Sequence, residues 1–308
     1  MSLTASLIKQ LNNFNVVAQR SQLGTLLSNL DTVAGTVYYV DNNAGLDTYD
    51  GSSWAKAFKT LAKGLAVSHA NIAASSTGWA ARNIIYYKAD AETANLVLLA
   101  DKTDVIGVGS YDHRPMPGII GNHVPVGAFM GTRFINVDFR SPAAGGDIWT
   151  VPTTVSGLSF IGCEFDGASA TPATGGIVIT TSERFTVQNC RFYGAFSDAV
   201  IELAGTEFNS LLIADNIIQG ANQGIDVKST VTTSIRAGYI LRNTINSTLE
   251  CINEASSKLY VNDNRCVTLA AKGSNGAGAI VAGAKMMLGN KISASDVANA
   301  DVPALGSL

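Results

Sequence analysis

Basic charge is scarce in this chain. Its 308 residues contain 21 Lys and Arg against 24 Asp and Glu, and charged residues make up only 15% of the total. A nucleic-acid-binding protein needs a basic surface to neutralise phosphates. The sequence therefore predicts no nucleic-acid partner.

Long apolar runs are missing as well. No apolar stretch approaches the roughly 18 residues that a membrane span requires, so we expect no membrane partner. The N-terminus is unlike a secretory signal, because Lys9 follows the first apolar residues and Asn12, Asn13 and Asn15 interrupt the hydrophobic stretch. We expect no Sec-dependent secretion.

Cysteine and histidine are too few and too scattered for a metal centre. The four cysteines form no CxxC pair, and the three histidines lie apart from them. We predict no metal and no cofactor, and buried thiols in place of disulfides. Cys163 and Cys190 are the pair that the fold below would stack as neighbours.

A repeat fills residues 126–295. Its segments are FINVDF, FIGCEF, VQNCRF, IADNII, ILRNTI, VNDNRC and MLGNKI, and their last residues are 26, 27, 26, 27, 21 and 26 positions apart. A second short strand follows most segments. Strands of this number and spacing fit one coil of a solenoid with rungs about 4.8 Å apart. The sequence predicts an all-β fold: a right-handed parallel β-helix with a short N-terminal helical segment and a capping helix.

One column of the repeat is rich in asparagine. The position two before each last residue holds Val137, Cys163, Cys190, Asn216, Asn243, Asn264 and Asn290. Four successive asparagines at one rung position indicate a ladder of stacked amides, which also tolerate the left-handed backbone of a sharp turn.

Four segments follow from this pattern. Residues 1–35 are a helical attachment or assembly segment, 36–125 hold the first strand, the capping helix and the first coils, 126–295 are the regular coils, and 296–308 are a C-terminal tail. In the first segment, apolar residues recur at helical steps and need a partner surface. They are Leu7, Leu11, Phe14, Leu23, Leu26 or Leu27, and Leu30.

The second segment mixes strands, loops and a helix. We predict strands at 36–40, 83–87, 96–99 and 105–108, a turn-rich loop at 41–51 and a loop at 111–125. A helix after Ser52 or Ser53 would place one apolar stripe on a single face. That stripe is Trp54, Phe58, Leu61 and Leu65.

Two loops of this segment could carry chemistry. Asp41, Asn43 and Asp47 could offer oxygen ligands to calcium, but they lack the spacing and the distal Glu of an EF-hand, so a turn-rich loop is the favoured interpretation. Residues 111–114 gather an acid, a base and a cation, and would need carboxylates from the coils to form a site.

The segment VYYVDNNAGLDTYDGSSWAKAFKTLAKGL resembles the N-terminal part of the pectin-lyase-like β-helix superfamily. The resemblance covers residues 36–70, with the coils at 126–295. It implies that the helix caps the open end of the apolar tube. The superfamily includes polysaccharide lyases and hydrolases, bacterial surface proteins, and phage tailspikes and fibres, so the fold alone does not specify the activity.

A helical, signal-less N-terminus is similar to segments that attach such proteins to a virion. We therefore expect a bacteriophage virion protein, a tail spike, fibre or capsid decoration, that is not an enzyme. It would be a homotrimer that contacts other virion proteins through residues 1–35. The alternatives are a depolymerase of bacterial surface polysaccharide, either a lyase or a glycoside hydrolase, and a non-catalytic carbohydrate-binding module.

If the chain is an enzyme, its candidate catalytic residues are Glu202, Asp226 and Glu254, on neighbouring second strands. We expect Asp226 to point outward, and Glu202 and Glu254 to share the inward phase of Ile179 and Val227. Solvated or interface ion pairs are the favoured interpretation of these acids.

Two outward columns complete the expectations. Asp138, Glu164 and Arg191 form one column, and Val178, Ile201 and Val281 form an apolar one that suits a threefold subunit interface.

Overall fold

The structure, a computed structural model, describes residues 35–75, 81–109, 116–152, 155–167, 171–228, 237–254, 259–268, 280–281 and 286–294. Of the predicted N-terminal segment only Gly35 is described, and the predicted C-terminal tail lies outside the described residues.

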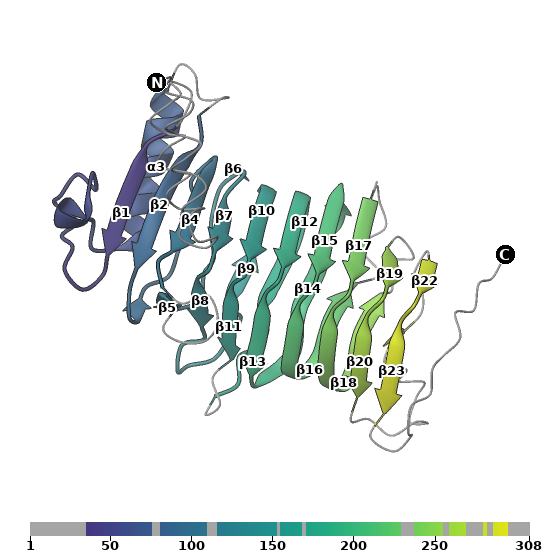
Figure 1. The fold of residues 1–308 in the computed structure, drawn as a ribbon. Coiled ribbons are helices and arrows are strands. Elements are labelled where there is room, and N and C mark those ends of the chain that lie inside the picture. Colours follow the sequence, from purple (N-terminus) through teal and green to yellow (C-terminus); the bar gives the residue numbers. More distant parts are fainter. Residues whose placement is uncertain are drawn as a thin grey trace, which may run out of the picture.

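The described strands stack into a parallel β-solenoid with three faces (Figure 1). The first face runs along the whole solenoid, and each of its strands pairs in parallel with the next. Its strands are β1 (Val37–Asp41), β2 (Asn83–Lys88), β4 (Thr103–Gly107), β7 (Arg133–Ile135), β10 (Val155–Ile161), the end of β12 (Ile177–Gln188), β15 (Ser210–Ala214), β17 (Ala237–Leu241), β19 (Tyr260–Asn262) and β22 (Met286–Leu288).

The second face is built in the same way, also from parallel pairs. It comprises β3 (Glu92–Thr93), β5 (Gly118–Ile120), β8 (Asp138–Arg140), β11 (Glu164–Gly167), β13 (Arg191–Gly194), the starts of β16 (Ile217–Val227) and β18 (Thr244–Glu254), β20 (Arg265–Thr268) and β23 (Lys291–Ala294).

The third face begins later, and its longer strands bend around the corners of the solenoid. It comprises β9 (Trp149–Val151), the start of β12, β14 (Phe196–Phe208), the ends of β16 and β18, and β21 (Ile280–Val281). The short strand β6 (Phe129–Met130) pairs with the start of β10. The predicted parallel β-helix is therefore confirmed.

Apolar columns fill the tube. Side chains alternate along a strand, so in-register stacking lines up every second residue on the inside. On the first face the inward column is buried from β1 to β19, with Phe134, Phe160, Val187, Ile213, Ile240 and Val261 fully enclosed. On the second face it holds Phe139, Phe165, Phe192, Ile218, Ile245 and Cys266. These are the two columns that the repeat predicts.

The asparagine ladder is also confirmed. Asn216 Nδ2 donates to Asn243 Oδ1 at 2.9 Å, Asn243 Nδ2 donates to Asn264 Oδ1 at 2.9 Å, and Asn264 Nδ2 donates to Asn290 Oδ1 at 3.0 Å. The same oxygens accept the backbone N–H of the preceding asparagine. The second Nδ2 hydrogen of each asparagine goes to a backbone carbonyl, so these buried amides are satisfied.

The sharp turn lies one residue before each ladder position, not at the asparagines themselves. Positive φ angles occur at Asn136, Gly162, Asn189, Asp215, Arg242, Asp263 and Gly289. This corrects the expectation that the ladder asparagines adopt the left-handed backbone. A residue in that region turns the chain between the first and second faces, and the next residue directs its amide into the stack.

The capping helix begins later than predicted. Trp54–Lys56 is a single 3₁₀ turn, Phe58 bridges to Val40, and the α-helix α3 spans Leu61–Ala74. Thr60 caps it by accepting from the backbone N–H of Lys63 at 3.2 Å. Apolar residues do recur at helical spacing from Trp54, but the helix itself begins only after the bridge at Phe58. Trp54 therefore lies outside the helix and is 41% exposed.

Helix α3 packs against β1, β2 and β4 at the N-terminal end of the solenoid (Figure 1). Gly64 allows the close approach, because a Cβ there would lie 2.8 Å from Val40 Cγ2. Val40 and Ile85 belong to the buried core. The helix therefore covers the inward-facing side chains of the first strands, where the solenoid ends and no further rung follows. This is the capping role that the resemblance implies.

Two expectations about the first coils are wrong. Residues 94–100 form no strand; Leu96 and Leu99 are buried from an irregular segment, and the Leu96 N–H donates to His123 Nδ1 at 3.1 Å. The expected loop at 111–125 contains β5, where Ile119 enters the core. Burial from a short or irregular segment leaves the same apolar signal as a strand.

Candidate functional site

The outer side of the third face brings two predicted acids together. Glu202 on β14 is the direct partner of Asp226 on β16, so their side chains leave the sheet one rung apart. Lys228 joins them, with its Nζ 2.5 Å from Asp226 Oδ2 and 3.7 Å from Glu202 Oε2. The outward phase expected for Asp226 agrees with this pairing.

The two acids differ in access. Asp226 is 2% exposed, and Asn253 Nδ2 donates to its other oxygen, Oδ1, at 3.0 Å. The Glu202 side chain is 17% exposed. Burial raises the pKa of Glu202; the charge of Lys228 opposes that shift, and the charge of Asp226 adds to it. Glu202 is therefore the more accessible of the two acids.

The phase expected for Glu202 is wrong. In the register of β12 with β14, Ile201 follows Ile177 in the inward column, and Glu202 follows Val178 in the outward one. Ile201 is fully buried, so it is not part of an apolar outer column. The repeat alignment placed Ala199 level with Gly224. In the structure Ala199 pairs with Gln223, the residue before that glycine, so the inward and outward residues of β14 are exchanged.

Glu254 is not brought into this group. Its backbone pairs with Val227, the inward phase that the sequence predicts, while the outward position of that rung belongs to Asn253. Its side chain lies outside the described residues, as does that of Val281. The described site is therefore Glu202, Asp226 and Lys228.

Such a site has limited chemistry. Glycoside hydrolysis uses two carboxylates about 5–9.5 Å apart, and adjacent rungs place side-chain origins about 4.8 Å apart. Asp226, however, engages Lys228 and Asn253 with its two oxygens, so it is poorly placed as a nucleophile or base. The arrangement offers one partly exposed carboxyl group and one cation, which suits polar binding better than two-carboxylate catalysis.

The second face carries another outward column of charge. Asp138, Glu164 and Arg191 stack on successive strands, as predicted. Arg191 Nη1 lies 3.5 Å from Glu164 Oε1, and Arg140 Nη2 lies 2.6 Å from Asp138 Oδ2. A hollow of about 230 Å³ opens beside Glu164 and Arg191. It is lined by Gly162, Cys163, Glu164, Asn189, Cys190, Arg191, Asp215 and Ile217.

Asp138 is the most perturbed acid of this column. Its side chain is fully buried, and within the described residues its Oδ1 has no hydrogen-bond partner. Burial raises the pKa of Asp138 to about 6, although Arg140 opposes the shift. The sequence placed Asp138 in an outward column but carried no sign that neighbouring side chains would enclose it.

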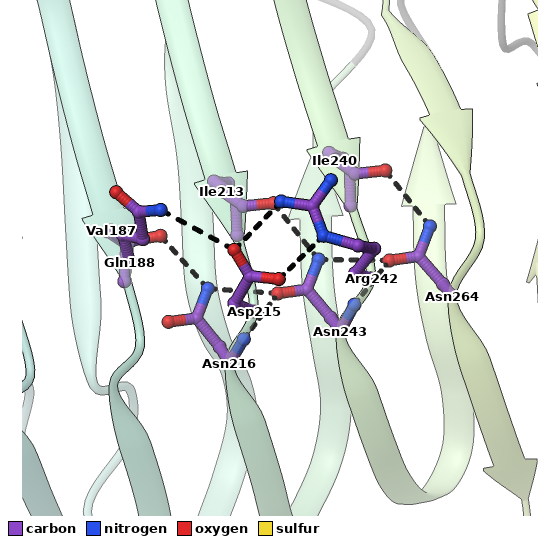
Figure 2. A network of polar contacts seen from close by, with 9 residues as sticks. All are labelled: Val187, Gln188, Ile213, Asp215, Asn216, Ile240, Arg242, Asn243 and Asn264. Atoms are coloured by element: carbon purple, nitrogen blue, oxygen red, sulfur yellow. Dashed lines mark hydrogen bonds and ion pairs between the residues drawn. The ribbon is translucent and has the colours of Figure 1, made fainter.

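A third charged group lies at the corner between the first and second faces (Figure 2). Arg242 Nε donates to Asp215 Oδ1 at 2.7 Å and Arg242 Nη2 donates to Asp215 Oδ2 at 2.8 Å, while Gln188 Nε2 reaches Asp215 Oδ2 at 3.4 Å. Sequence reasoning missed this group. Its signal was available, because Asp215 and Arg242 each precede a ladder asparagine by one residue.

The loop expected to turn at 41–51 uses its carboxylates internally. Asp41 Oδ1 accepts the backbone N–H groups of Asn43 and Ala44, and Asp47 Oδ1 accepts those of Lys59 and Thr60. Across the described ranges, no group of three or more His, Cys, Asp and Glu could hold a metal ion. Residues 111–114 lie outside these ranges.

The four cysteines are buried free thiols, as predicted. Burial, with Cys163 alongside, raises the pKa of Cys190 well above its ordinary value. Such thiols pack as small apolar groups. In the described part of the chain, no helix is long and apolar enough to cross a membrane.

Comparison with known proteins adds no further assignment: no family model, curated protein or solved structure matches this chain.

Proposed function

We propose that this chain is a non-enzymatic structural protein of the bacteriophage virion surface, a pectin-lyase-like β-helix that assembles as a homotrimer. In this proposal residues 1–35 attach it to other virion proteins, as part of a tail spike, a fibre or a capsid decoration. The rigid stack of parallel rungs suits a protein that must project or cover a surface without changing shape.

The pairing of the outward acids is the observation that carries this proposal. Seven of them form ion pairs with basic side chains, most of these across neighbouring rungs, and so strengthen the solenoid rather than standing free for catalysis. The pairs are Asp41 with Lys88, Asp104 with Arg82 and Arg133, Asp138 with Arg140, Glu164 with Arg191, Asp215 with Arg242, and both Glu202 and Asp226 with Lys228.

Exposed valines support the trimer. Val97 is 56%, Val124 38% and Val126 61% exposed, and the Val126 N–H donates to the Val97 carbonyl at 3.0 Å. His123 pairs with Trp149, so Val124 lies in line with the outer side of the third face. Exposed apolar residues grouped in this way are typical of subunit interfaces.

Size-exclusion chromatography with light scattering tests the assembly. We expect a trimer, and a monomer after the double change Val97→Glu and Val126→Glu, because two charges cannot be buried without partners. Val108→Glu is the matched control, since Val108 is 43% exposed elsewhere on the solenoid and should leave the trimer intact. A wild-type monomer would count against the proposal, as would a gene neighbourhood without capsid or tail genes.

A second candidate function is a depolymerase of bacterial surface polysaccharide. One observation favours it: the raised pKa of Glu202, beside Asp226 and Lys228, is what a general acid requires. Capsular and lipopolysaccharide substrates should then yield shorter products, and Glu202→Gln should abolish them. Full activity in both Glu202→Gln and Asp226→Asn would remove this site. Glycan retention without any product would instead indicate a carbohydrate-binding module.

A further inference from the structure

An apolar stripe crosses the outer side of the first face. Tyr39, Tyr86, Ile106, Ile135 and Ile161 are consecutive partners on β1, β2, β4, β7 and β10. Each alternates with a core residue, so each points away from the tube. Five apolar side chains in one outward column are unusual for a sheet face that meets water.

The stripe is partly buried. Tyr86 is only 6% exposed, and the other four side chains are half-buried. Helix α3 cannot provide this cover, because it packs on the opposite side of the same strands, against Val40 and Ile85. Tyr39 contacts Tyr86 and Trp54, with ring centroids 5.7 and 4.9 Å away, which accounts for one end only.

The stripe has clear limits. The next residue in the column after Ile161 is Gln188. The outward column beside it is polar from the third strand on, with Asp104, Arg133 and Ser159 in succession. A partner for this surface therefore needs an apolar face about one side chain wide and five rungs long.

We infer that residues 1–34 of the same chain dock along this stripe as amphipathic helices. They join the described chain at Gly35, two residues before β1, whose Tyr39 opens the stripe. Their apolar residues recur at helical steps and need a covering surface. They are Leu7, Leu11, Phe14, Leu23, Leu26 or Leu27, and Leu30.

The dimensions agree. Four steps between strands, at about 4.8 Å each, make the stripe about 19 Å long. A helix rises about 1.5 Å per residue, so roughly 13 helical residues span it. The polar side of the docked segment stays free for the virion contacts proposed above.

Limited proteolysis of the full-length protein tests the docking. Lys9 and Arg20 are trypsin sites within the segment. We expect slow cleavage at both in the wild type and at least tenfold faster cleavage in Ile135→Glu, with the solenoid intact by circular dichroism. Leu11→Glu should release the same sites from the other side of the contact, which keeps the test valid if Ile135→Glu fails to fold.

The matched control is Ser159→Glu, which adds a charge to the neighbouring polar column and should leave both cleavage rates unchanged. Equal rates in the wild type, Ile135→Glu and Leu11→Glu would overturn the inference. Protection that disappears on dilution of the wild type would overturn it too, because it would assign the stripe to a second copy. The trimer variants above alter other residues, so either proposal can fail alone.

Discussion

The early and late rungs of this solenoid are held together in different ways. Up to β11 the strands have two to seven residues, and the core is a cluster of unlike aromatic contacts. From β12 the strands reach 13 residues. Beyond β14 the buried core side chains are aliphatic or cysteine, and the asparagine ladder runs beside them. The same tube can thus be specified by individual packing or by one repeated contact.

The aromatic cluster depends on shape. Phe134 and Phe160 stack with centroids 5.6 Å apart, while Trp149 meets Phe134, Phe139 and Phe160 at 5.2 to 5.3 Å and at different angles. No two of these residues have the same neighbours. In the ladder, by contrast, each asparagine makes the same contacts one rung further on, so an error in one place leaves the pattern elsewhere intact.

Truncation of the aromatic core should have the largest effect. Phe160→Ala should lower the free energy of unfolding by about 4 kcal/mol, because neighbours on three rungs lose contacts and cannot close the cavity. Ile240→Ala, in the same inward column but between the aliphatic partners Ile213 and Val261, should cost about 3 kcal/mol. Urea denaturation of both compares the two regions; an equal cost would mean that the aromatic cluster relaxes as readily as the aliphatic core.

Breaking the ladder should come next. Asn243→Ala removes hydrogen bonds to Asn216, Asn264 and the Ile213 carbonyl. It leaves buried polar groups without partners, at a cost of about 3 kcal/mol. Asn246→Ala, at an exposed position of β18 three residues later, should change stability by less than about 0.5 kcal/mol. If the two variants unfold alike, the stacked amides contribute no more than surface ones.

The same difference explains what the sequence could predict. The ladder and both inward columns repeat at a near-constant spacing, so a single alignment finds them, and the structure confirms them. The early rungs offer no such check. Leu96 and Leu99 are buried without a strand, and Trp54 continues the helical period while lying outside α3.

The candidate site was harder to predict than the tube. Outward residues do not repeat, and one misplaced residue at Ala199 exchanges the inward and outward faces, as happened for Ile201 and Glu202. The pairing of Asp226 with Lys228 follows from their i, i+2 spacing. The enclosure of Asp138 does not, because it depends on residues far away in the sequence.

A change of pH should alter stability through Asp138 in the early rungs, and this effect should be smaller than those of the core and ladder substitutions. The folded pKa of Asp138, about 6, exceeds its ordinary value of 3.8, so the folded state holds a proton that the unfolded state has released between these values. This group therefore favours folding below the window and opposes it as pH rises through it. Relative to Asp138→Asn, the wild type should lose about 2 kcal/mol between about pH 4 and pH 7.

Urea midpoints across that range provide the measurement. His123 acts in the opposite direction. Burial lowers the pKa of His123 to about 3, so the wild type loses stability as pH falls below 6.5. A pH-independent difference between wild type and Asp138→Asn would show that Asp138 stays ionised in the folded protein.

The exposed corner pair should have the smallest effect. Arg242 holds the pKa of Asp215 below its usual range by hydrogen bonding, yet the Arg242 side chain is 53% exposed and water and salt screen the pair. Asp215→Asn should therefore cost less than about 1 kcal/mol, and the cost should vanish in about 1 M salt. Asp263→Asn, at the same turn position two rungs later, is the control, and the Asn243→Ala deficit should persist in salt. A salt-resistant loss in Asp215→Asn as large as that of Asn243→Ala would mean that the outer pair, not the inner amides, holds the late rungs together.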